Sequence, residues 1–125
     1  MRISNVYRPM VFGCRADEPL GEVARWMKDN EIGALAVVDG DQVLGIITER
    51  DLVGALATSA EPAAQPAEAY ASTQIRTAGL EEDVQDVARR MLDDGIRHLP
   101  VQDQGGRVVG MVSMRDLLAL EIWTS

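Results

Sequence analysis

An internal repeat constrains the fold of this chain more than any other feature of its sequence. The segment Leu20–Leu52 matches Val84–Leu117 when it is shifted by 64 positions, so that Val23 falls on Val87 (87 − 23), and the second copy has one additional residue in its turn. Two copies are too few for a solenoid, in which longer arrays of repeats stack on one another. The repeat instead predicts two half-domains related by a pseudo-twofold axis.

Each copy has the same order of expected elements. Apolar residues spaced as i, i+3, i+4 and i+7 predict an amphipathic helix at the start of each copy. These residues are Leu20, Val23, Ala24 and Met27 in the first copy, and Val84, Val87, Ala88 and Met91 in the second. Two apolar runs joined by the turns DGDQ or DQGG then predict a hairpin. Thr48 and Ser113 follow at the N-cap positions of a second helix.

The order helix, strand, strand, helix predicts the α/β (α+β) class, and we expect one further strand before each copy, in MVFGCR and QIRTAG. We predict a first domain over residues 1–58, a linker over 59–72 and a second domain over 73–125. The linker contains Pro62 and Pro66 among small residues, which is typical of a connecting segment. We therefore expect at most partial order in it.

Composition argues against several classes of function. The net charge of −8 does not favour nucleic acid, which prefers a basic face, or an anionic membrane, so an anionic ligand would need a local group of basic residues. Cys14 is the only cysteine, which excludes an intrachain disulfide and a zinc site built on cysteines alone. We find no apolar run of about eighteen residues and no signal peptide at the start. We therefore expect a cytoplasmic protein.

The most informative motif is a heptad written twice, GIITERD at Gly45–Asp51 and GMVSMRD at Gly110–Asp116. Its hydroxyl can accept from the N–H groups of a helix's first turn, and the same helix end attracts phosphate. The aspartate three residues later lies on about the same face and can accept from two neighbouring hydroxyls, as an acidic residue does for ribose in dinucleotide sites. The glycine allows close approach. The same spacing also fits a capping pair that only starts a helix, and the two interpretations are compatible.

The two heptads, the helix and hairpin before each, and GIRHLPV at Gly95–Val101 resemble the CBS domain, named after cystathionine β-synthase, present as a tandem pair. The resemblance covers nearly the whole chain except the linker. It implies two pseudo-symmetric half-domains, each with a short sheet and two helices, packed through their sheets. It also implies two clefts, which in this family commonly hold adenosine-containing ligands. By the same resemblance, Asp51 and Asp116 grip ribose hydroxyls, and Thr48 and Ser113 touch phosphate.

Two basic residues distinguish the second copy. Arg97 and His98 precede LPV, where the family often has a basic residue that faces the phosphates, whereas the first copy is uncharged there. The cleft reached by Arg97 is therefore expected to prefer phosphorylated ligands, and the two clefts are expected to differ. The alternative interpretation is an exposed pair at the start of a strand.

Small residues complete the candidate site. Ala34, Ala36 and Pro100 begin the first hairpin strand of each copy, where they leave room for a flat base or simply pack as strand residues. Gly13 and Cys14 correspond to a stretch whose backbone often meets the base in this family. Cys14 is interpreted as a small buried apolar residue rather than a reactive thiol.

The sequence therefore predicts a non-catalytic regulatory module that binds an adenine nucleotide such as AMP, ADP or ATP and needs no cofactor. Nothing local orients Cys14 and His98 as a catalytic pair, and one histidine excludes a histidine-rich metal site. The last helix is apolar on more than one side, and Trp26 lies off the apolar face of its own helix. These surfaces predict a homodimer. The alternative is a module that docks on an unidentified effector protein without binding nucleotide.

Overall fold

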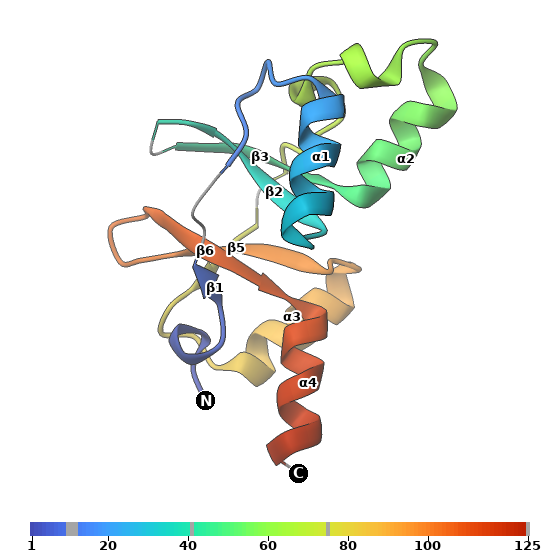
Figure 1. Cartoon of the computed structure of the whole chain (residues 1–125). Coiled ribbons are helices and arrows are strands. Elements are labelled where there is room, and N and C mark those ends of the chain that lie inside the picture. The colour runs from blue at the N-terminus through green and yellow to red at the C-terminus, as the bar shows by residue number, and fades with distance from the viewer. Residues whose placement is uncertain (10–12, 41, 75, 125) are drawn as a thin grey trace. The chain divides into compact units, whose positions relative to one another are not determined.

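The computed structural model describes residues 1–9, 13–40, 42–74 and 76–124, with the backbone alone for residues 121–124. It divides into two compact units (Figure 1). The first-copy unit is Phe12–Ile75, and the second-copy unit combines Met1–Val11 with Arg76–Ser125. Each unit holds one copy of helix, strand, strand and helix, which confirms the mixed α/β class. The predicted domain boundaries at residues 58 and 73 were placed from the sequence repeat. The two units are instead defined by which residues pack together, so the N-terminal segment belongs to the second-copy unit.

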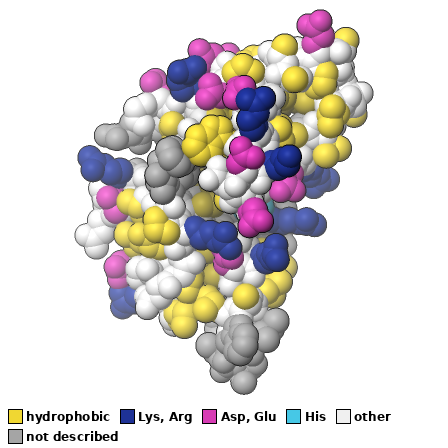
Figure 2. All heavy atoms as spheres, viewed as in Figure 1, with side chains coloured by type: hydrophobic (Ala, Val, Ile, Leu, Met, Phe, Trp, Pro, Cys, Tyr) yellow, Lys and Arg dark blue, Asp and Glu magenta, His cyan; other side chains and the backbone are white. Residues whose placement is uncertain are grey.

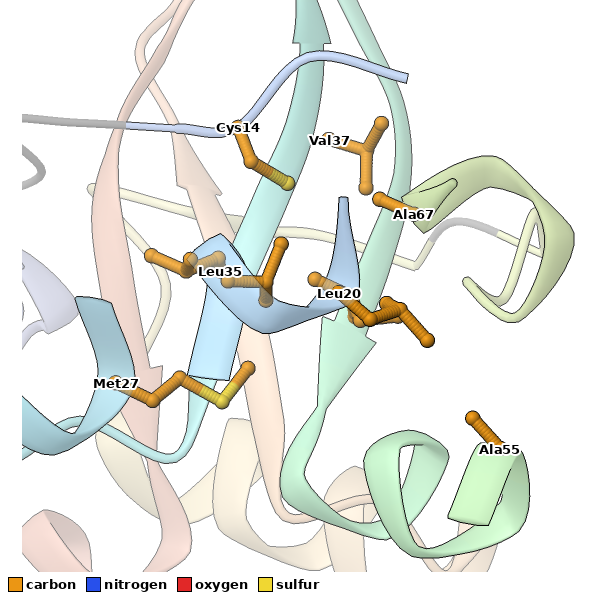
Figure 3. Close-up of a cluster of buried hydrophobic side chains, with 9 residues drawn as sticks. Cys14, Leu20, Met27, Leu35, Val37, Ala55 and Ala67 are labelled. Carbon is orange, nitrogen blue, oxygen red and sulfur yellow. The ribbon is translucent and has the colours of Figure 1, made fainter. Parts of the chain in front are cut away.

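The first-copy unit consists of a hairpin covered by helices. Its elements are α1 (Leu20–Asn30), β2 (Ala34–Asp39), β3 (Gln42–Thr48), α2 (Glu49–Thr58) and the 3₁₀ turns η2 (Pro62–Ala64) and η3 (Ala67–Ala69). Alternate residues of β2 face a buried apolar cluster, as the period of a strand requires. The cluster, shown in Figure 3, consists of Cys14, Leu20, Val23, Met27, Leu35, Val37, Ile47, Ala55 and Ala67.

The apolar face of α1 differs from the prediction at two positions. Ala24 is exposed, whereas Trp26 is half-buried and packs against the cluster of the first-copy unit. Because an indole removes much more apolar area from water than a methyl group does, the helix turns its tryptophan rather than its alanine toward the core. The expectation that Trp26 lies off the apolar face is therefore wrong.

The segment 59–72 is more ordered than its composition suggested. It contains η2 and η3, and Ala67, the first residue of η3, is fully buried in the core. Leu20 N donates to the Gln65 carbonyl, and Ala67 N to the Glu18 carbonyl, each at 2.8 Å. The small residues that indicated a linker instead let the backbone lie close against α1. The expectation of at most partial order is wrong.

The second-copy unit is built on a mixed sheet with the order β1-β6-β5-β4. Its elements are η1 (Ile3–Asn5), β1 (Arg8–Pro9), β4 (Ala78–Gly79), α3 (Val84–Asp94), β5 (His98–Gln102), β6 (Val108–Ser113) and α4 (Met114–Thr124). Its core is aliphatic and includes a residue from the N-terminal segment. The buried members are Ile3, Ala78, Val87, Met91, Leu99, Val101, Val112 and Leu117. The N-terminus is thus tied into the second copy.

Candidate functional site

The heptad of the first copy places a complete capping box at the start of α2. Thr48 Oγ1 accepts from the Asp51 backbone N–H at 3.4 Å, and Asp51 Oδ2 accepts from the Thr48 backbone N–H at 2.8 Å and from its hydroxyl at 3.1 Å. Two otherwise unpaired N–H groups are thereby satisfied. The capping interpretation is confirmed here, and the half-buried carboxylate lies at the helix end that attracts anions.

The heptad of the second copy uses its aspartate differently. Ser113 Oγ accepts from the Asp116 backbone N–H at 3.1 Å, as the cap predicts. The Asp116 carboxylate instead accepts two hydrogen bonds from Arg8, with Nε 3.1 Å from Oδ2 and Nη2 3.0 Å from Oδ1. The Asp116 side chain is 19% exposed, whereas that of Arg8 is 64% exposed. One motif therefore holds its carboxylate in two different environments.

The glycines of the heptads admit neighbouring backbone. A Cβ added to Gly110 would lie 2.2 Å from the Arg8 carbonyl oxygen, and one added to Gly45 would lie 2.6 Å from the Ser72 carbonyl oxygen. Both glycines thus allow an outer segment to pair with the heptad strand. Arg8 pairs with Met111 in this way, and Ser72 forms a bridge with the residue after Gly45. The close approach predicted from the glycines is therefore made by another segment of the same chain.

Strand pairing brings the basic residues of the second copy to its heptad. His98 of β5 is directly opposite Ser113 of β6, and Met114 N donates to the Arg97 carbonyl at 2.8 Å. Paired residues of an antiparallel ladder carry their side chains on the same face, so His98 and Ser113 share one face of the sheet. Pro100 follows two residues along β5 on that same face. The Arg97 side chain is exposed and that of His98 half-buried.

The small residues of the first copy gather along β2. Ala34 is opposite Thr48, the equivalent of the pair His98–Ser113, and Cys14 N donates to the Ala36 carbonyl at 2.9 Å. A Cβ added to Gly13 would lie 2.9 Å from the same Ala36 oxygen. The predicted residues of the first copy, other than Asp51, are therefore neighbours on or beside β2.

The Cys14 thiol is buried, and desolvation, with the nearby Glu18 charge as a second cause, raises its pKa to about 11. At pH 8 this thiol is almost entirely protonated and thus a poor nucleophile. We expect iodoacetamide at pH 8 to leave Cys14 of the folded chain unmodified and to label it in urea, as measured by intact-mass spectrometry. Labelling of the folded chain at the rate seen in urea would contradict this account.

Arg8 is a neighbour of the second heptad that the sequence reasoning missed. The offset of 64 that aligns the two copies also aligns Arg8 with Ser72 (72 − 8), and both residues pair beside a heptad strand. Extending the repeat alignment upstream would have shown that a cation in one copy replaces a hydroxyl in the other, but the position of each beside a heptad strand comes from the strand pairing.

Neither a metal-ligand cluster nor a membrane-spanning helix is found in the part of the chain that the structure describes. Within the described ranges, no three His, Cys, Asp or Glu side chains are placed to hold a metal ion, and no helix has the length and apolarity needed to cross a membrane. On the face seen in Figure 2, Lys and Arg side chains lie among Asp and Glu rather than in one large basic patch. A cation beside a heptad is therefore a local feature.

Comparison with known proteins gives a consistent result. A family model described as the CBS domain matches residues 3–58 and again 67–122. An uncharacterised 17.7 kDa protein of Acidianus ambivalens is 34% identical over 117 residues, which are 93% of this chain and 70% of that protein.

Two solved structures share the whole fold. The CBS domain pair of protein MJ0100, in complex with 5′-methylthioadenosine and S-adenosyl-L-methionine, has a TM-score of 0.91 and 26% identity, covering 100% of this chain and 98% of that one. A CBS-domain-containing protein of Agrobacterium tumefaciens has a TM-score of 0.89 and 27% identity, covering 97% and 99%.

Proposed function

Because the chain belongs to the CBS-domain family and carries the domain twice, we propose that it is a non-catalytic regulatory module whose two heptads bind adenosine-containing ligands. The observation that supports this most directly is the repeated placement of a carboxylate and a hydroxyl at a helix N-terminus. In each copy the hydroxyl caps the first turn, so that the aspartate three residues later lies at the positive end of the helix.

The proposed roles follow from the chemistry of these groups. Asp51 and Asp116 accept hydrogen bonds from the two hydroxyls of a ribose, and Thr48 and Ser113 lie beside its phosphate. Among the described residues, Asp51 uses Oδ2 for its cap, which leaves Oδ1 to accept from a ligand. Capping and ligand binding are thus compatible.

The remaining predicted residues complete this proposal. Arg97 and His98 supply positive charge and donors for phosphate in the second copy. The small residues of the first hairpin strands and the stretch before β2 leave room for the base; they are Ala34, Ala36, Pro100, Gly13 and Cys14. The CBS pair of protein MJ0100, which holds two adenosine derivatives, supports this ligand class.

Regulation requires that the ligand bind two conformations unequally, because a ligand with equal affinity for both shifts neither. We place the module in the cytoplasm, as a homodimer that passes the signal to an effector protein. It requires no cofactor besides the ligand itself.

The test is calorimetric titration with adenosine, AMP, ADP, ATP, NADH and S-adenosylmethionine. Asp51→Asn and Asp116→Asn keep the shape of the side chain but remove the charge. We expect each substitution to weaken binding at its own heptad by about 10–100-fold, since a charge-assisted hydrogen bond contributes about 1.5–3 kcal/mol. Asp93→Asn, at an exposed position of α3, is the matched control and should bind as the wild type does. A ligand held equally by wild type and both heptad variants would refute the assignment of these residues.

A second function is favoured by one observation. Leu56 of α2, Leu92 of α3 and Leu118 of α4 are 70%, 70% and 55% exposed, and exposed apolar side chains mark interaction sites where they form a contiguous patch. A protein-interaction module that binds no nucleotide would have such surfaces. It predicts that no adenosine compound raises the melting temperature, whereas ligand binding raises it by mass action.

A further inference from the structure

We propose that Arg8 is the specificity-determining residue of the second heptad: it makes that heptad prefer adenosine compounds with an anionic phosphate over uncharged adenosine. This inference rests on the proposed function and deepens it, since it concerns what the Asp116 site selects.

The ion pair itself suggests this role. The Arg8 guanidinium uses Nε and Nη2 to hold both oxygens of the Asp116 carboxylate. A guanidinium has five N–H donors, and its bonds to Asp116 use two of them among the described residues; the Arg8 side chain is 64% exposed. It can therefore keep the carboxylate on one edge and bind an anion on another. A carboxylate alone would repel a phosphate bound beside it, and the paired arginine offsets that repulsion.

The fold fixes Arg8 in this position. Arg8 and Pro9 form β1, which pairs with Met111 and Gly110 of β6. Upstream, Ile3 is fully buried and its N–H donates to the Glu82 carbonyl at 2.9 Å. The arginine is thus carried by a strand that pairs with β6 and is anchored upstream through Ile3, so its backbone has a defined place.

A hollow lies beside the ion pair. Its volume is about 260 Å³, and its lining consists of Asn5, Val6, Arg8, Asp116, Ala119 and Leu120. Small-molecule pockets usually have roughly 300–1,000 Å³, so this hollow is small for a whole nucleotide. Because Arg8 is part of its lining, it offers room for a phosphate-sized group beside this side chain.

Among the described residues, the first copy has no arginine paired with its heptad aspartate. Its equivalent position is Ser72, which pairs beside β3 but carries no charge, and Asp51 is held by its own cap instead. The difference predicts two unlike sites. At the second heptad, the ribose of either compound must share Asp116 with Arg8, but only a phosphate gains contacts to the remaining donors of Arg8.

The experiment compares AMP with adenosine on the full chain. The parent protein and each variant carry Asp51→Asn, so that the measured heat comes from binding at the second heptad. The wild-type chain is titrated for comparison. Arg8→Met removes the charge at similar length, and Arg8→Lys keeps the charge but not the two-pronged contact. Arg2→Met is the matched control, because Arg2 forms another exposed ion pair, with Glu81, in the same N-terminal segment. Thermal unfolding checks that each variant is folded.

We expect Arg8→Met to weaken AMP binding by about ten-fold or more and to leave adenosine binding unchanged or tighter, because only the charge-assisted contact to phosphate is lost. The AMP affinity of Arg8→Lys should fall between those of the parent and Arg8→Met, and Arg2→Met should bind both compounds as the parent does. If Arg8→Met weakens the binding of AMP and adenosine equally, Arg8 has a structural role. If it strengthens the binding of both equally, Arg8 only competes with the ligand for Asp116. Either result, or unchanged binding of both compounds, overturns the proposal while the proposed function stands. Binding to wild type but not to the Asp51→Asn parent also overturns it. If wild type binds neither compound nor any other adenosine compound, both proposals fail.

Discussion

Replacing Gly110 by alanine is expected to lower the free energy of unfolding by about 3 kcal/mol, near the upper end for overpacking. The added Cβ would lie 2.2 Å from the Arg8 carbonyl oxygen and 2.4 Å from the Tyr7 ring, and a backbone oxygen cannot turn aside as a flexible side chain can. The whole of β1 must therefore shift away from β6. Urea denaturation followed by circular dichroism measures the change.

The chain provides a matched control for this substitution. Gly54 lies inside α2, and a Cβ added there meets nothing within 4 Å. Because glycine is a poor helix former, Gly54→Ala should stabilise the chain by about 0.5–1 kcal/mol. Gly45→Ala should act like Gly110→Ala, since its Cβ would meet the Ser72 carbonyl at 2.6 Å. A Gly110→Ala chain that unfolds at the same urea concentration as wild type would show that β1 does not pack as described.

Replacing Met91 by alanine is expected to cost about 3 kcal/mol, because truncating a buried methionine removes apolar burial and leaves a cavity. Met91 is 1% exposed and belongs to the core of the second-copy unit, whereas Leu92, the next residue of α3, is 70% exposed. Leu92→Ala should therefore change stability by no more than about 0.5 kcal/mol. Urea denaturation of the two variants gives the comparison, and equal losses would mean that α3 is rotated from the orientation described.

Local patterns in the sequence were sufficient to predict the order of elements. The apolar spacing of Val87 and Met91 predicts the face of α3, and the hydroxyls of Thr48 and Ser113 predict where α2 and α4 begin. These signals act within one turn of helix or one hairpin. They depend little on the rest of the chain, which explains why the structure confirms them.

The predictions from the sequence were wrong where packing between distant segments determines the local structure. Pro62 and Ala67 lie in a stretch whose composition is typical of a linker, yet Ala67 is fully buried because α1 offers a surface for it. Similarly, no local pattern links Arg8 to Asp116, which is 108 positions away in the sequence. The ion pair exists because β1 adds to the sheet of the second-copy unit.

The two heptads keep the same key residues but have different neighbours. Both keep glycine, hydroxyl and aspartate, but the residue that pairs beside the heptad strand is Ser72 in one copy and Arg8 in the other. Part of the electrostatic difference between the copies therefore lies outside the heptad itself. Under the proposed function, such a change alters what a site selects while its capping geometry is retained.

The most direct test of the central claim is a calorimetric titration of the double variant Asp51→Asn/Asp116→Asn with the adenosine compound that the wild-type chain binds most tightly. We expect micromolar binding to wild type, which corresponds to about −8 kcal/mol, and no measurable heat with the double variant, whose cooperative unfolding transition shows that it is still folded. Binding of the double variant with wild-type affinity would show that the two carboxylates do not hold the ligand.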